Sequence, residues 1–180
     1  MRIEEEIKLD YSDVLFRPKR STLKSRKDVD LNRTYKFKHS KFTWKGTPII
    51  ASNMDGVGEI NLAKKLLSHK LMTALTKQHT IEQIGSIYKN KNFINFVALS
   101  CGTSPDSYNR MNKILSKYPK FQFICIDVAN GYSENFSHFV SNVRKKYPKK
   151  TIIAGNVVTA DMTQELVLSG ADIVKVGIGP

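Results

Sequence analysis

From residue 47 onward, short apolar segments rich in Ile, Val and Phe alternate with longer segments of helical periodicity. This alternation is typical of βαβ units on a parallel sheet. The apolar runs are continuous rather than alternating, as in strands that are covered on both faces. They predict strands at residues 48–52, 71–75, 96–100, 123–127, 151–154 and 173–176.

Capping residues at the starts of the intervening segments support this assignment. Thr80 and Gln83 form a capping-box pattern, in which a hydroxyl and an amide satisfy the first free backbone N–H groups of a helix. Ser104 precedes a proline and an acid, a sequence typical of a helix amino terminus. Thr159 predicts another start, and Gly170 suits the left-handed position that ends that helix.

About six strands and five helices are therefore predicted, which favours a TIM (β/α)8 barrel truncated after about the sixth strand. The chain has 180 residues, whereas a whole barrel typically needs about 250. An open, doubly wound parallel sheet is the structural alternative. We expect two parts, a polar amino-terminal arm over residues 1–46 and a partial barrel over residues 47–180.

The chain is strongly basic, with a formal net charge of +13 and a pI near 9.7. A lysine-rich solvated surface is the simplest interpretation, and an anionic substrate is another. A nucleic-acid partner is a weaker alternative, because no aromatic RNA-binding motif or zinc-finger spacing accompanies the lysines.

Neither a signal-peptide pattern nor an apolar run long enough to span a membrane occurs in the sequence, so we expect a cytoplasmic protein with no membrane partner.

Polar and glycine-rich residues follow each predicted strand. They occupy residues 53–56, 76–79, 101–103, 127–131, 155–159 and 177–180. Because the carboxyl ends of parallel strands meet at one edge of the sheet, these residues predict a site for a polar ligand with ribose and phosphate groups. There is no GxGxxG or Walker motif, so a nucleotide would not be held by a Rossmann or P-loop site.

Lys77 and Asp127 are the most informative of these residues. Lys77 could hold an anion or take part in proton transfer, or it could be one more surface lysine. Asp127 closes an apolar run and could bind a ribose or cofactor, or cap the following turn.

The histidines and cysteines favour structural roles. His69 and His79 have no identifiable partner in the sequence. Cys101 and Cys125 lie in apolar runs, where a reduced and buried thiol is expected, although Cys101 at a strand end could also be a nucleophile.

Several long motifs resemble GMP reductase, a member of the IMP dehydrogenase/GMP reductase family. The motifs are LDYSDVLFRPKRSTLKSR (residues 9–26), PIIASNMD (48–55), CIDVANGYSE (125–134), AGNVVT (154–159) and SGADIVKVGIGP (169–180). The resemblance implies NADPH-dependent reductive deamination of GMP to IMP with release of ammonia. It also implies a (β/α)8 barrel that assembles as a homotetramer, binds a monovalent cation (K+) and attacks the purine through a cysteine thiolate.

The resemblance also implies roles for individual residues. Lys77 matches the catalytic lysine near the reacting centre, which also contacts the cofactor. Met54 and Asn156 match residues on the purine side. The cofactor contacts implied are Ser25, Arg26, Asp127, Val128, Ala129, Ile178 and Gly179, and Gly179 also belongs to the cation loop.

Two departures from the family pattern bear on activity. Gly56 replaces the usual threonine, and Thr76, Gln78 and His79 replace His, His and Tyr around Lys77. In the family, Gly-Ile-Gly-Pro is followed by Gly-Ser-Val-Cys-Thr-Thr-Arg, which holds the nucleophile and is not part of these 180 residues.

We therefore expect the chain to be inactive alone, and the abrupt end at Pro180 suggests a cut. A fragment or split chain of a reductase, a degenerate product, a nucleotide-binding scaffold and an IMP dehydrogenase-like enzyme remain open.

Overall fold

The computed structural model describes residues 5–7 and 9–178, which fall into two units divided after Asp30. The first unit contains two short 3-10 helices, η1 (Tyr11–Asp13) and η2 (Arg26–Asp28). Reciprocal capping boxes close both of them, formed by Asp10 with Asp13 and by Ser25 with Asp28. Each of these short helices is therefore closed by hydrogen bonds between residues three positions apart.

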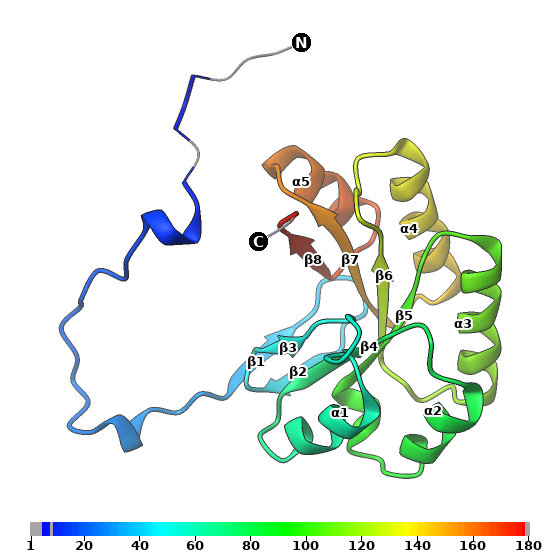
Figure 1. The fold of residues 1–180 in the computed structure, drawn as a ribbon, viewed down its shortest axis with the longest axis horizontal. Coiled ribbons are helices and arrows are strands. Elements are labelled where there is room, and N and C mark those ends of the chain that lie inside the picture. The colour runs from blue at the N-terminus through cyan, green and yellow to red at the C-terminus, as the bar shows by residue number, and fades with distance from the viewer. Residues whose placement is uncertain (1–4, 8, 179–180) are drawn as a thin grey trace. The chain divides into compact units, whose positions relative to one another are not determined.

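The second unit is built on a parallel sheet of six strands that pair in chain order (Figure 1). The strands are β3 (Ile50–Ala51), β4 (Met72–Leu75), β5 (Val97–Cys101), β6 (Phe123–Asp127), β7 (Thr151–Val157) and β8 (Ile173–Val176). Every predicted strand is present, and β7 extends three residues beyond its predicted end. No helix among the described residues is long and apolar enough to cross a membrane.

The helices α1 (Ile60–Leu67), α2 (Ile81–Tyr88), α3 (Pro105–Lys117), α4 (Glu134–Lys146) and α5 (Ala160–Leu168) connect these strands, with a short 3-10 helix η3 (Phe93–Asn95) before β5. The predicted caps are confirmed. Thr80, Ser104 and Thr159 each accept a backbone N–H of the helix that they precede. Gly170 has a φ of +112°, the backbone conformation that favours glycine after a helix end.

Two apolar layers lie on opposite faces of the sheet. Residues from all five helices pack with Leu99, Ile126 and Ile152 on one face, and Figure 1 shows the helices along that side of the curled sheet. A doubly wound sheet would have helices on both faces, whereas here the other face packs with Trp44 and its neighbours. The barrel prediction is therefore confirmed and the doubly wound alternative is wrong.

An antiparallel hairpin supplies this inner layer, and the sequence did not predict it as a hairpin. It is formed by β1 (Arg33–Lys36) and β2 (Thr43–Gly46). Trp44 is 3% exposed, and its indole N–H donates to the carbonyl of Asn95 at 3.0 Å. The hairpin belongs to the second unit, and the boundary after residue 46 stays a prediction about domain organisation.

Asp172, in the turn before β8, anchors the hairpin. Its carboxylate accepts the backbone N–H groups of His39 at 2.8 Å, Ser40 at 3.2 Å and Ile152 at 3.2 Å. It also pairs with the Arg144 guanidinium at 2.6 Å, and the Asp172 side chain is fully buried. One carboxylate therefore connects the hairpin, α4 and β7.

Candidate active site

A cavity lies at the carboxyl ends of strands β3 to β6. It is lined by Asn53, Asp55, Thr76, Lys77, Gln78, Ser100, Cys101 and Asp127. These residues follow or end four different strands, as the parallel topology requires. The structure thus brings together Lys77 and Asp127, which the sequence singled out.

Lys175 in β8 is a functional candidate that the sequence reasoning missed. Its ammonium group forms an ion pair with the Asp127 carboxylate and lies 3.2 Å from the Asn53 amide oxygen. Alternation along β8 explains its direction, because Ile173 packs in the inner layer and Val174 packs toward the helices. The sequence did contain a signal for this position. Lys175 lies two residues after Ile173 in the same strand, so its side chain is expected on the same, inner face of the sheet.

The ion pair between Lys175 and Asp127 determines which hydrogen bonds the cavity can offer to a ligand. Side chains of Lys175 and Asp127 are 27% and 34% exposed, so both groups are only partly solvated. An ammonium group that contacts a carboxylate and an amide oxygen restrains the orientation of both partners. Carboxylate and amide groups that are held in this way can accept and donate hydrogen bonds to sugar hydroxyls or to a purine edge.

The Thr76 hydroxyl and the Asn156 amide oxygen are among the buried polar atoms that have no hydrogen-bond partner in the described part of the chain. Thr76 is only 5% exposed. Leaving a buried polar group without a partner costs about 1–3 kcal/mol. The site therefore holds hydrogen-bonding capacity that a ligand could satisfy.

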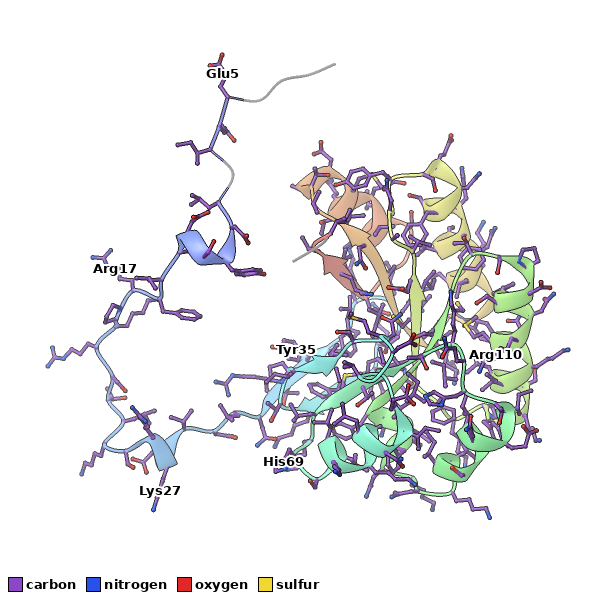
Figure 2. All side chains as sticks on the ribbon, in the orientation of Figure 1. Glu5, Arg17, Lys27, Tyr35, His69 and Arg110 are labelled. Atoms are coloured by element: carbon purple, nitrogen blue, oxygen red, sulfur yellow. The ribbon has the colours of Figure 1, made fainter. Side chains whose placement is uncertain are left out.

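The loops that carry Met54 and Lys77 are joined through the Gly58 carbonyl. This oxygen accepts the Thr76 backbone N–H at 2.9 Å and the His79 ring Nε2–H at 3.1 Å. Arg110, labelled in Figure 2, reaches from α3 to donate to the His79 carbonyl. The buried His79 ring thus has the structural role that was favoured for it.

Lys77 itself is exposed beside the cavity. Of the departures on either side of it, the His79 ring donates to the Gly58 carbonyl, whereas the Thr76 hydroxyl has no hydrogen-bond partner among the described residues. The Gly56 departure also has a structural basis, because Gly56 has a φ of +75° in the turn after Met54. A threonine in that backbone conformation would be strained.

Neither cysteine is suited to be a nucleophile. Cys101 and Cys125 are both free and about 1% exposed. Burial, with smaller contributions from Cys125 and Asp127, raises the pKa of Cys101 to about 12. Burial raises the pKa of Cys125 to about 11. The buried, reduced state that the sequence favoured is confirmed, since a reactive cysteine needs thiolate character and access.

The remaining residues of the second unit that the resemblance points to lie around the same strand ends. The Val128 N–H donates to the Gly155 carbonyl at 2.9 Å, and the Asn156 N–H donates to the Val128 carbonyl at 2.9 Å. Ala129 is exposed, and Ile178 is 47% exposed. The two hydrogen bonds of Val128 continue the pairing with β7 one residue beyond the end of β6.

The other three predicted contacts are Ser25, Arg26 and Gly179. In the first unit, the Ser25 hydroxyl accepts the Lys27 N–H at 3.3 Å and Arg26 is exposed. Gly179, predicted for the cofactor and the cation, lies outside the described residues. Within residues 5–7 and 9–178, no group of three or more His, Cys, Asp or Glu side chains could hold a metal ion.

Comparison with known proteins places these features in a family context. The family model described as "IMP dehydrogenase / GMP reductase domain" matches residues 8–180. GMP reductases of Klebsiella pneumoniae and Vibrio atlanticus are each 54% identical over 182 residues, which cover 100% of this chain and 52% of theirs. The chain therefore spans about half the length of the curated relatives that it matches.

A solved structure supports the same fold. The crystal structure of inosine 5′-monophosphate dehydrogenase from Legionella pneumophila superposes with a TM-score of 0.74 at 29% sequence identity. The match covers 93% of this chain and 50% of that one.

Proposed function

The chain belongs to the IMP dehydrogenase/GMP reductase family, and we propose that it contributes the strand-end site of a GMP reductase. The proposed reaction is the NADPH-dependent reductive deamination of GMP to IMP with release of ammonia. The observation that carries the proposal is the cavity with Lys77 and the Asp127–Lys175 ion pair, in a chain 54% identical to GMP reductases.

The polar groups around this cavity suit a purine nucleotide. The unpartnered Asn156 amide oxygen could accept a hydrogen bond from the purine, and Met54, which is 63% exposed, could pack against its ring. Lys77 would hold or transfer a proton near the reacting carbon. Each role follows from the family resemblance and is compatible with the position of the residue.

The residues proposed for the cofactor fit its chemistry in part. The Asp127 carboxylate, oriented by Lys175, is a suitable acceptor for ribose hydroxyls. Val128, Ala129 and Ile178 border the same strand ends. Ser25 and Arg26 are proposed for the phosphate groups, because a guanidinium binds phosphate with two parallel hydrogen bonds. NADPH would supply the hydride when bound.

The covalent nucleophile is proposed to lie outside the described residues. Cys101 and Cys125 are buried with raised pKa values, so neither supplies a thiolate at neutral pH. We expect the 180 residues alone not to turn over GMP. A K+ site at Gly179, a homotetramer and a cytoplasmic location are further proposals from the resemblance.

The experiment joins this chain to the remainder of the Klebsiella pneumoniae GMP reductase that follows the aligned region. NADPH oxidation with GMP is measured for the chimera, for its Lys77→Ala variant and for the chain alone. Activity only in the unaltered chimera supports the proposal. Turnover by the chain alone would contradict the assignment of the nucleophile.

IMP dehydrogenase is the second candidate, favoured by the structural match to the Legionella pneumophila enzyme. The same chimera separates the two candidates, because NAD-dependent oxidation of IMP without GMP reduction would replace the reductase assignment. The higher identity to GMP reductases favours the first outcome.

A further inference from the structure

A turn of residues 128–132, between β6 and α4, is bonded to the segment 155–159 at the end of β7. Beside the two hydrogen bonds of Val128, the Gly131 N–H donates to the Asn156 carbonyl at 2.8 Å. A Cβ at Gly131 would lie 2.7 Å from that carbonyl oxygen, so a side chain there would force the two segments apart. The backbone of Asn156 is thus held in place, while its buried amide oxygen has no partner in the part of the chain that the structure describes.

The Tyr132 side chain holds the far end of the same segment. Its phenol oxygen accepts the backbone N–H groups of Val158 at 3.0 Å and of Thr159 at 2.9 Å. Its hydroxyl donates to the Thr159 side chain at 3.2 Å. The Tyr132 backbone is fixed in turn, because its N–H donates to the Asn130 side-chain oxygen at 3.0 Å. One hydroxyl therefore uses its proton and its acceptor capacity on two adjacent residues.

Helix capping does not explain why a tyrosine stands here. Thr159 is the N-cap of α5, and its side chain already accepts the Met162 N–H at 3.4 Å. Val158 and Thr159 are exposed, so water could bond their N–H groups as well as the phenol does. Tyr132 is itself 39% exposed, so these bonds do not serve to bury its ring. What the phenol adds over water is a fixed position for the end of this segment.

We propose that Tyr132 is a positioning residue for Asn156, an inference that rests on the proposed function of this site. Asn156 lies between two anchors, the Gly131 N–H at its own carbonyl and the Tyr132 hydroxyl two and three positions later. These anchors restrain the Asn156 backbone, and with it the direction of the side chain, before a ligand arrives. A purine that bonds a preorganised amide oxygen loses less of its binding free energy to ordering the site.

The test is Tyr132→Phe, which removes one oxygen atom and keeps the ring. In the chimera with the Klebsiella pneumoniae reductase, we expect the KM for GMP to rise about five- to tenfold, the effect of losing about one hydrogen bond. The kcat should stay within about twofold, because the restraint serves binding in the ground state and the transition state equally. The KM for NADPH should also change little, because both Val128 bonds remain.

Tyr147→Phe is the matched control at the other end of α4. It makes the same chemical change, since the Tyr147 hydroxyl donates to the Asn112 side chain at 2.7 Å. Urea titration compares the stability of the two variants. The control should leave the KM for GMP unchanged. An equal rise in this KM in both variants would reduce Tyr132 to a general contribution to stability and overturn the inference.

Hydrogen exchange in the 180-residue chain tests the restraint independently of the reaction. The N–H groups of Val158 and Thr159 should exchange about tenfold faster in Tyr132→Phe and at the original rate in Tyr147→Phe. Unchanged exchange in Tyr132→Phe would overturn the inference whether or not the chimera reduces GMP. Faster exchange with an unaltered KM for GMP would overturn the positioning role. A chimera that neither binds nor reduces GMP would instead overturn the proposed function, and with it the purine as the ligand of Asn156.

Discussion

Removing the Asp172 carboxylate should be the most damaging single change in the second unit. The side chain is fully buried and accepts hydrogen bonds from three backbone N–H groups and from Arg144. Removing one member of a buried ion pair costs about 3–5 kcal/mol. Each backbone bond adds about 1 kcal/mol, with less than full additivity.

We therefore expect Asp172→Ala to lower the free energy of unfolding by about 4–6 kcal/mol. Asp172→Asn keeps one oxygen acceptor and the side-chain volume, so it should cost roughly half as much. At a slope of about 2 kcal/mol per molar urea, the alanine variant should shift the midpoint by about 2–3 M. Asp161→Asn, an exposed acid in the first turn of α5, is the control and should cost at most about 1 kcal/mol.

Tryptophan fluorescence gives a direct assay for this reasoning. Trp44 is the only tryptophan in the chain, and it lies on the hairpin that Asp172 anchors. Release of the hairpin should expose Trp44 and shift its emission to longer wavelengths. If Asp172→Ala had the same urea midpoint and the same emission spectrum as the unaltered chain, the role assigned to this carboxylate would be refuted.

Three further predictions concern other parts of the molecule. Cys101 and Cys125 should resist alkylation at pH 8 in the native state and react on unfolding. The fold raises the pKa of both thiols and so favours their protonated forms, which means that the free energy of unfolding should decrease as pH rises from about 9 toward 11. Urea titration measures this decrease, which should be smaller in a variant with both cysteines changed to alanine. Gly170→Ala should cost about 1–3 kcal/mol in the same titration, because φ is +112° and a Cβ would lie 2.7 Å from the Arg144 side chain. In the chimera, Lys175→Met should raise the KM for NADPH at least tenfold, whereas Lys175→Arg, which keeps the positive charge beside Asp127, should leave the KM near that of the unaltered chimera. An equal rise in KM in both variants would contradict the proposal that Lys175 orients Asp127.

Local signals made much of the fold predictable. Continuous apolar runs located all six strands of the barrel sheet, because buried parallel strands have this pattern wherever they occur. Thr80, Ser104 and Thr159 revealed helix starts through bonds that span three residues. Buried strands and helix caps depend on residues that are close together in the sequence, so the sequence alone predicts them.

Features that depend on distant residues could not be predicted in this way. Lys175 meets Asn53 across 122 positions, and Asp172 meets His39 across 133. Polar segments in the first 46 residues gave no sign that Trp44 would enter the barrel. The positions of candidate residues at strand ends were predictable, but the groups that pair with them were not.

The long separation between the hairpin and Asp172 has a consequence for biosynthesis. Residues 33–46 leave the ribosome long before Asp172 is made, and at about 5–20 residues per second the delay is roughly 6–30 s. During this interval the sheet face that covers Trp44, Phe37 and Phe42 in the folded unit is still incomplete, because one of its residues, Ile173, follows Asp172 in the chain. A nascent chain of this kind offers chaperones an early recognition segment, and its release would wait for the synthesis of the last described strand.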